Sequence, residues 1–124
     1  MAKLFVLLAA VAYAAVLVTS DPSHCYECNI LNHSCNSPIN LNFVGKQDCS
    51  KPINTQGHKN TTSKKICFTV RATFFFAHVT ERGCFYSEME NEDVCSFFNR
   101  TEASGPGTGN FSCEICDTDY CNNQ

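Results

Sequence analysis

Ten cysteines constrain this 124-residue chain more than any other feature of its sequence. They are even in number and all follow an apolar N-terminal stretch, a combination that predicts five disulfides in a secreted domain. One bridge contributes roughly 2–4 kcal/mol in the chain-entropy model, so five compare with the whole stability of a domain, about 5–15 kcal/mol. We expect the bridges, more than the small apolar core, to hold the fold. The cysteines are Cys25, Cys28, Cys35, Cys49, Cys67, Cys84, Cys95, Cys113, Cys116 and Cys121.

The N-terminal stretch has the pattern of a secretory signal peptide. Lys3 supplies a basic start, residues 4–18 are apolar or tyrosine, and Val18 and Ser20 are small enough for signal peptidase. This run is shorter than the roughly 20 apolar residues that a membrane span needs. The sequence therefore predicts a signal peptide at residues 1–20 and a secreted, extracellular domain at 21–124. Cleavage after Ala14 remains an alternative.

Charge excludes nucleic acid as a partner. Removing Lys3 with residues 1–20 leaves eight basic against 12 acidic side chains, a net charge of −4, and no basic run follows. The acidic residues between Glu88 and Asp93 are interpreted as a solvated loop.

Neither metal binding nor catalysis is predicted. Two C-x-x-C pairs, Cys25/Cys28 and Cys113/Cys116, offer enough thiolates for zinc, but they lie far apart and leave six cysteines over in an oxidising compartment. Neither an H-E-x-x-H nor a G-x-S-x-G motif is present. We expect a protein that is not an enzyme and uses no cofactor or metal.

Strand signals dominate the segment after the signal peptide. Lys65–Val70 alternates, Phe74–Thr80 is rich in aromatic and β-branched residues, and Leu41–Val44 is a weaker candidate strand. Sustained helical periodicity is missing, so helix should be a minority. The glycine-rich residues 105–109 predict an exposed, flexible loop tip.

Two further features concern the surface and the chain end. Four N-x-S/T sequons, which predict surface glycans in a secreted chain, begin at Asn32, Asn60, Asn99 and Asn110. The sequence ends three residues after Cys121 with no hydrophobic tail, so we expect no GPI anchor and a released protein.

Segments at both ends resemble one known family. The C-terminal C-E-I-C-D-T-D-Y-C-N-N from Cys113 resembles the closing motif of Ly6/uPAR and three-finger toxin domains, and the opening C-Y-E-C-N from Cys25 resembles their C-Y-x-C. The segment Thr80–Cys84 is similar to the one that closes the second finger in many neurotoxins. The C-x-x-C-D-T-D-x-C-N form is most similar to the insect Quiver/Sleepless-like branch. The resemblance covers Cys25–Asn122 and implies an all-β, small, disulfide-rich three-finger (snake-toxin-like) domain.

The resemblance also implies a disulfide pairing, which the number of cysteines alone does not fix. Finger one spans Cys25–Cys49, finger two Cys67–Cys84 and finger three Cys95–Cys113, and Asn122 ties the C-terminal segment to the core. The implied pairs are Cys25–Cys67, Cys28–Cys35, Cys49–Cys84, Cys95–Cys113 and Cys116–Cys121.

The function implied by the resemblance is binding. It implies a monomer that modulates the extracellular domain of a membrane protein, such as a neuronal potassium channel or a nicotinic acetylcholine receptor. A soluble toxin-like antagonist or defence factor is one alternative, and a structural role at cell junctions is another.

Finger two is the predicted contact surface. Residues 64–82 contain no Gly, Pro, Asn or Asp, so a tight turn is not expected, and a wider loop is predicted near Thr73–Phe76. Strand alternation would place Phe74 and Phe76 on one side and Phe75 on the other. Exposed aromatics beside an arginine are typical of binding hot spots. The predicted partner-binding residues are Arg71, Phe74, Phe75, Phe76 and His78.

Overall fold

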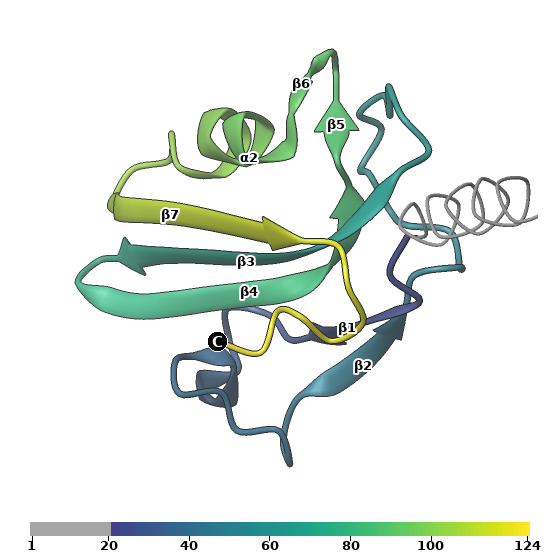
Figure 1. The fold of residues 1–124 in the computed structure, drawn as a ribbon. Coiled ribbons are helices and arrows are strands. Elements are labelled where there is room, and N and C mark those ends of the chain that lie inside the picture. The colour runs from purple at the N-terminus through teal and green to yellow at the C-terminus, as the bar shows by residue number, and fades with distance from the viewer. Residues whose placement is uncertain (1–20) are drawn as a thin grey trace, which may run out of the picture.

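The computed structural model describes residues 21–124, and the predicted signal peptide lies outside them. The described chain is mostly strands, with one nine-residue helix against a three-stranded sheet (Figure 1). Across residues 21–124 no helix is long and apolar enough to cross a membrane. The elements are β1 His24–Glu27, the 3-10 helix η1 His33–Cys35, β2 Gly45–Asp48, β3 Lys65–Phe74, β4 Ala77–Tyr86, β5 Glu88–Met89, β6 Glu92–Asp93, α2 Val94–Glu102 and β7 Thr108–Cys116.

Finger two is a long antiparallel hairpin of β3 and β4, and β7 joins it in the sheet order β4-β3-β7. The ladder runs without interruption from Lys65↔Tyr86 to Phe74↔Ala77. Ile66, Phe68 and Val70 alternate along β3 and are all buried, as expected of a strand with one face on the core. The predicted strand at residues 65–70 is therefore confirmed and extends four residues further.

The tip of finger two differs from its prediction. Because Phe74 pairs with Ala77, only Phe75 and Phe76 form the turn, and both have positive φ, 46° and 70°. The prediction of a wider loop was wrong, as was that of one strand over residues 74–80. Continuous pairing of the long strands determines where the chain turns, and this outweighs the poor turn propensity of phenylalanine.

Finger one contains the short β1–β2 ladder, in which His24 pairs with Asp48. The predicted strand at residues 41–44 was wrong, because these residues form turns and bends. The Asn40 side chain accepts a hydrogen bond from the Asn42 backbone at 3.2 Å, and the Phe43 amide donates to the Asn40 carbonyl at 3.1 Å. These local bonds use the backbone groups that a strand would need.

The helix α2 was not located from the sequence, although helix is a minority as predicted. Asp93 is its N-cap and accepts a hydrogen bond from the Ser96 amide at 3.1 Å. Val94, Phe97 and Phe98 form its buried stripe. The preceding acidic residues are not a plain loop, since β5 and β6 pair as a small hairpin.

Two clusters form the interior. One is apolar and lies between α2 and the sheet, and its buried members are Ile66, Phe68, Val70, Met89, Val94, Phe97 and Phe98. The other gathers the buried cysteines where the fingers meet, namely Cys25, Cys49, Cys67 and Cys84.

Five disulfides close the described chain, and no cysteine is free. The pairs are those that the family resemblance implied. The all-β three-finger fold is thereby confirmed, with finger three departing from a plain hairpin because α2 forms one of its sides. The exposed turn at 105–107 lies where predicted, but Thr108 and Gly109 already belong to β7.

Candidate binding surface

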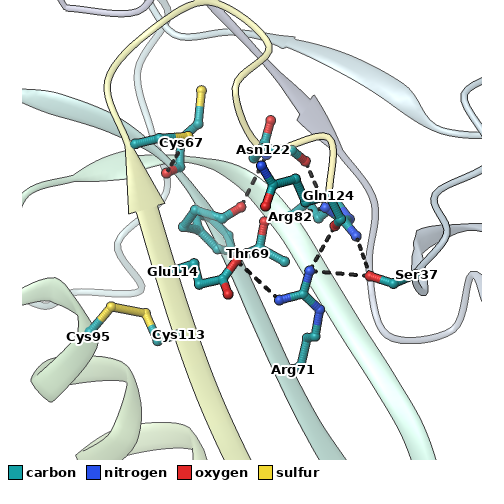
Figure 2. A network of polar contacts seen from close by, with 12 residues as sticks. Ser37, Cys67, Thr69, Arg71, Arg82, Cys95, Cys113, Glu114, Asn122 and Gln124 are labelled. Carbon is teal, nitrogen blue, oxygen red and sulfur yellow. Dashed lines mark hydrogen bonds and ion pairs between the residues drawn. A yellow bond between two sulfur atoms is a disulfide. The ribbon is translucent and has the colours of Figure 1, made fainter.

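Arg82 ties the bases of the fingers together. It is only 1% exposed and donates to the Cys35 carbonyl at 2.9 Å. It also donates to the carbonyl of Asn122 at 2.7 Å, and Figure 2 shows both Arg82 and Asn122. Burial, followed by the nearby charge of Arg71, lowers the pKa of Arg82 to about 10, so it stays charged at neutral pH. One buried guanidinium thus joins finger one, finger two and the C-terminal segment.

Asn122 completes this tie from the other side. Its Oδ1 accepts from the Tyr26 amide at 2.9 Å, and its Nδ2 donates to the Tyr26 carbonyl at 2.9 Å and the Phe68 carbonyl at 3.1 Å. The side-chain amide therefore bonds both backbone groups of Tyr26 in β1, as a neighbouring strand would, and also bonds β3. This is the structural role that the resemblance implied for Asn122.

Arg71 lies on the same face of the sheet as Arg82, away from the helix. Its guanidinium pairs with Glu114 at 3.3 Å and donates to the Ser37 hydroxyl at 3.2 Å and the Gln124 carbonyl at 2.7 Å (Figure 2). These contacts hold the C-terminal segment against the sheet. The structure therefore does not gather Arg71 with the predicted aromatic residues.

The three phenylalanines do lie together at the far end of finger two from the cysteine cluster. Phe74 and Phe75 meet edge to face with ring centroids 4.6 Å apart. Phe75 also leans on finger three, because its amide donates to the Gly107 carbonyl at 3.0 Å. Phe76 is 98% exposed, against 64% for Phe75 and 46% for Phe74. Strand alternation does not describe this arrangement, since two of the rings belong to the turn.

This turn is strained. Positive φ costs a non-glycine residue roughly 1–2 kcal/mol, and here two bulky residues adopt it in succession. Gly107 has a φ of +83°, and a Cβ there would lie 2.7 Å from the Phe75 ring, so only glycine lets the ring rest on finger three. Strained residues of this kind cluster at functional sites, which makes the turn a candidate contact.

His78 is exposed on β4 opposite Thr73, on the face that carries Arg71. Its carbonyl accepts a hydrogen bond from the Asn36 side chain at 3.4 Å. His78 is thus near the tip in sequence but faces away from Phe74.

The four sequons differ in their surroundings. Asn99 on α2 and Asn110 on β7 are exposed, whereas Asn32 and Asn60 are half-buried. The Asn32 amide donates to the Phe43 carbonyl at 2.9 Å, and Asn60 accepts from the Thr62 amide at 2.8 Å. The exposed pair is better placed for a glycan, and all four stay predictions.

Sequence reasoning missed other exposed or charged groups. Leu31 and Phe43 of finger one are 84% and 69% exposed. Glu81 on β4 and Glu102 at the end of α2 line a groove beside the helix. The two glutamates are brought together only by the fold, so no local pattern signals them.

Three fingers held by five disulfides, joined at a cysteine cluster and locked by Asn122, define a three-finger domain of the u-PAR/Ly-6-like kind. A family model described as the Quiver family u-PAR/Ly-6-like domain matches residues 24–122. The chain belongs to the Quiver family. No curated protein and no solved structure shows a significant match to it.

Proposed function

We propose that the protein is a secreted, non-catalytic binding protein whose finger-two tip contacts the extracellular domain of a membrane receptor or channel. Within that class we infer a neuronal potassium channel or a nicotinic acetylcholine receptor, because the sequence resembles the Quiver/Sleepless-like branch. The exposed aromatic turn Phe75–Phe76 is the observation that carries the proposal.

Rigid presentation supports this assignment. The ten-pair β3–β4 ladder and the bond between Phe75 and Gly107 fix the tip before it meets a partner. Pre-ordered aromatic side chains lose little conformational entropy on binding, which leaves more of their burial energy as affinity. Arg71 contributes indirectly, by holding the C-terminal segment against the same sheet.

Phe76 provides the largest single share of the apolar surface at the tip. A phenylalanine exposed to this degree contributes roughly 1.5–3 kcal/mol when fully buried in a partner. Phe74 and Phe75 extend the same apolar tip toward finger three. Together they form a small patch of the kind that dominates binding energy at protein interfaces.

The test uses fluorescently labelled secreted protein on cells that each display one channel or receptor of the two classes. Phe75→Ala and Phe76→Ala should each weaken binding to the responsive cells at least tenfold, about 1.4 kcal/mol. Leu31→Ala on finger one is the matched control, since Leu31 is also highly exposed. It should bind like the parent.

Folding of each variant is checked by far-UV circular dichroism and by the absence of labelled thiols. If both tip variants fold and bind like the parent while Leu31→Ala loses binding, finger one rather than finger two makes the contact. If no displayed channel or receptor binds the parent protein, the proposed partner class is wrong.

A further inference from the structure

The helix leaves half of one sheet face uncovered. Along β3, alternate residues from Ile66 to Phe74 point to the face on which α2 packs. The helix ends at Glu102 and covers only the part of this face nearest the cysteine cluster. The part toward the finger-two tip, beginning at Val70, remains open as a groove.

This groove has apolar walls and the size of a ligand site. Its volume is about 610 Å³, within the range of roughly 300–1,000 Å³ for small-molecule sites. Finger one contributes Ile30, and the loop after α2 contributes Pro106. The apolar side chains that the sheet and the finger-two turn contribute are Val70, Ala72, Phe74, Phe75, Val79 and Phe111.

Two carboxylates stand at the inner end of the groove. Glu81 comes from β4 and Glu102 from the last turn of α2, and both also line a second cavity of about 610 Å³ beyond them. Within residues 21–124, neither side chain has an ion pair or hydrogen bond, although Glu90, Glu92 and Glu114 all pair with arginines. The groove thus combines an apolar surface with negative charge that the described chain does not neutralise.

The electrostatics of the pair agree with this geometry. Burial raises the pKa of Glu81. Burial, followed by the charge of Glu81, raises the pKa of Glu102 to about 7. Both shifts express the cost of desolvating a carboxylate, and the charge of Glu81 adds to that cost at Glu102. A bound cation would relieve it. The other charged groups near them, across the second cavity, are Glu27, His58 and Arg82.

We propose that the groove binds a small organic cation, an ammonium group carried on an apolar or aromatic body. The ammonium would lie between Glu81 and Glu102, and the apolar body would lie against Val79, Phe74 and Phe111 toward the tip. A neutral apolar ligand would leave the carboxylates desolvated and unpaired, and an anion would be repelled.

Three ligands of one shape separate charge from apolar contact: 4-phenylbutylammonium, 4-phenylbutan-1-ol and 4-phenylbutanoate. Each is titrated into the secreted protein at pH 8, with affinity from calorimetry and position from the methyl NMR signals of Ile30 and Val79. The ammonium should bind at least tenfold more tightly than the alcohol, and the butanoate more weakly than both. The methyl signals of both residues should shift with the ammonium.

Variants then assign the charge effect. Glu81→Gln/Glu102→Gln should remove the preference for the ammonium over the alcohol. Glu102→Gln alone should reduce it, and this variant keeps the test open should the double variant fail to fold. Glu88→Gln is the control, because Glu88 is exposed and lines neither cavity. It should leave the preference unchanged.

Several outcomes would overturn the proposal. They are equal affinity for ammonium and alcohol, no saturable ammonium binding at millimolar concentration, and an unchanged preference in the glutamine variants. A capped Phe-Lys dipeptide amide that bound tenfold more tightly than the free amine would assign the groove to a protein partner instead of a small molecule. None of these results depends on the finger-two tip contacting a receptor, so the two proposals fail separately.

Discussion

Replacing Phe76 by glycine should stabilise the protein although it removes a large apolar side chain. The ring is 98% exposed, so its loss removes almost no native packing. The φ of +70° costs a phenylalanine about 1–2 kcal/mol and a glycine nothing. Glycine adds about 0.5–1 kcal/mol of unfolded-state entropy. The difference predicts that Phe76→Gly unfolds with a free energy about 0.5–1 kcal/mol higher than the parent.

Phe76→Ala is the matched variant, because it removes the same ring but keeps the strained φ. Its free energy of unfolding should stay within about 0.5 kcal/mol of the parent. Both are measured by urea unfolding with the disulfides intact, followed by far-UV circular dichroism, since the chain has no tryptophan. If Phe76→Gly is no more stable than Phe76→Ala, the turn is not strained, and backbone strain does not support a binding role for the tip.

Three further predictions concern the base, the surface and the groove. Arg82→Met leaves two buried carbonyls without their donor and should lower the free energy of unfolding by about 2–5 kcal/mol in the same urea assay. Arg100→Met removes only solvent-exposed ion pairs and should have a much smaller effect. Asn99→Gln and Asn110→Gln should each remove one glycan from the intact mass of the secreted protein, and unchanged masses would exclude those sites. The pKa of Glu102 is about 7 in the folded state and about 4.5 in the unfolded chain, so the folded state binds this proton more tightly. Proton binding at Glu102 therefore adds its full stability below about pH 4.5, and this stability is lost as the pH rises through about 7. Although the Glu102 carboxyl is partly desolvated in the groove, the residue as a whole is exposed, so solvent screening reduces the effect to about 1 kcal/mol. Glu102→Gln should abolish it in unfolding measurements from pH 4 to pH 8.

The cysteine framework could be predicted because its signals are local and ordered along the chain. The opening C-Y-E-C and closing C-D-T-D-Y-C-N segments fix both ends of the domain, and the pairing follows from family resemblance. Asn122 could be assigned for the same reason. The Quiver family match over residues 24–122 agrees with that reading.

The finger-two turn could not be predicted from its own residues. Nothing in Thr73–Phe76 favours positive φ, and the turn at Phe75 is set by strand pairing that begins ten residues earlier at Lys65↔Tyr86. Arg71 illustrates the same limit, since its partner Glu114 lies 43 positions away and reaches it only through β7. Tertiary pairing decides both outcomes.

The sequence of α2 does contain a helix pattern, but the pattern is too short to be distinctive. Asp93 precedes Val94, Phe97 and Phe98, which is an N-cap followed by apolar residues at helical spacing. Two turns of that pattern resemble an irregular aromatic segment. The groove had no such signal, because Glu81 and Glu102 meet only after α2 packs across β3 and β4.

The proposal that the aromatic rings of Phe75 and Phe76 contact the partner is tested most directly by a variant that lacks both rings but keeps the turn. Asn-Gly is the preferred sequence for a two-residue hairpin turn with positive φ at both positions, so Phe75→Asn/Phe76→Gly keeps the turn and removes both rings. The measurement is equilibrium binding of this variant to cells displaying the responsive receptor or channel. We expect this variant to be at least as stable as the parent and its affinity to fall more than tenfold. Parent-like affinity in the folded variant would contradict the proposal.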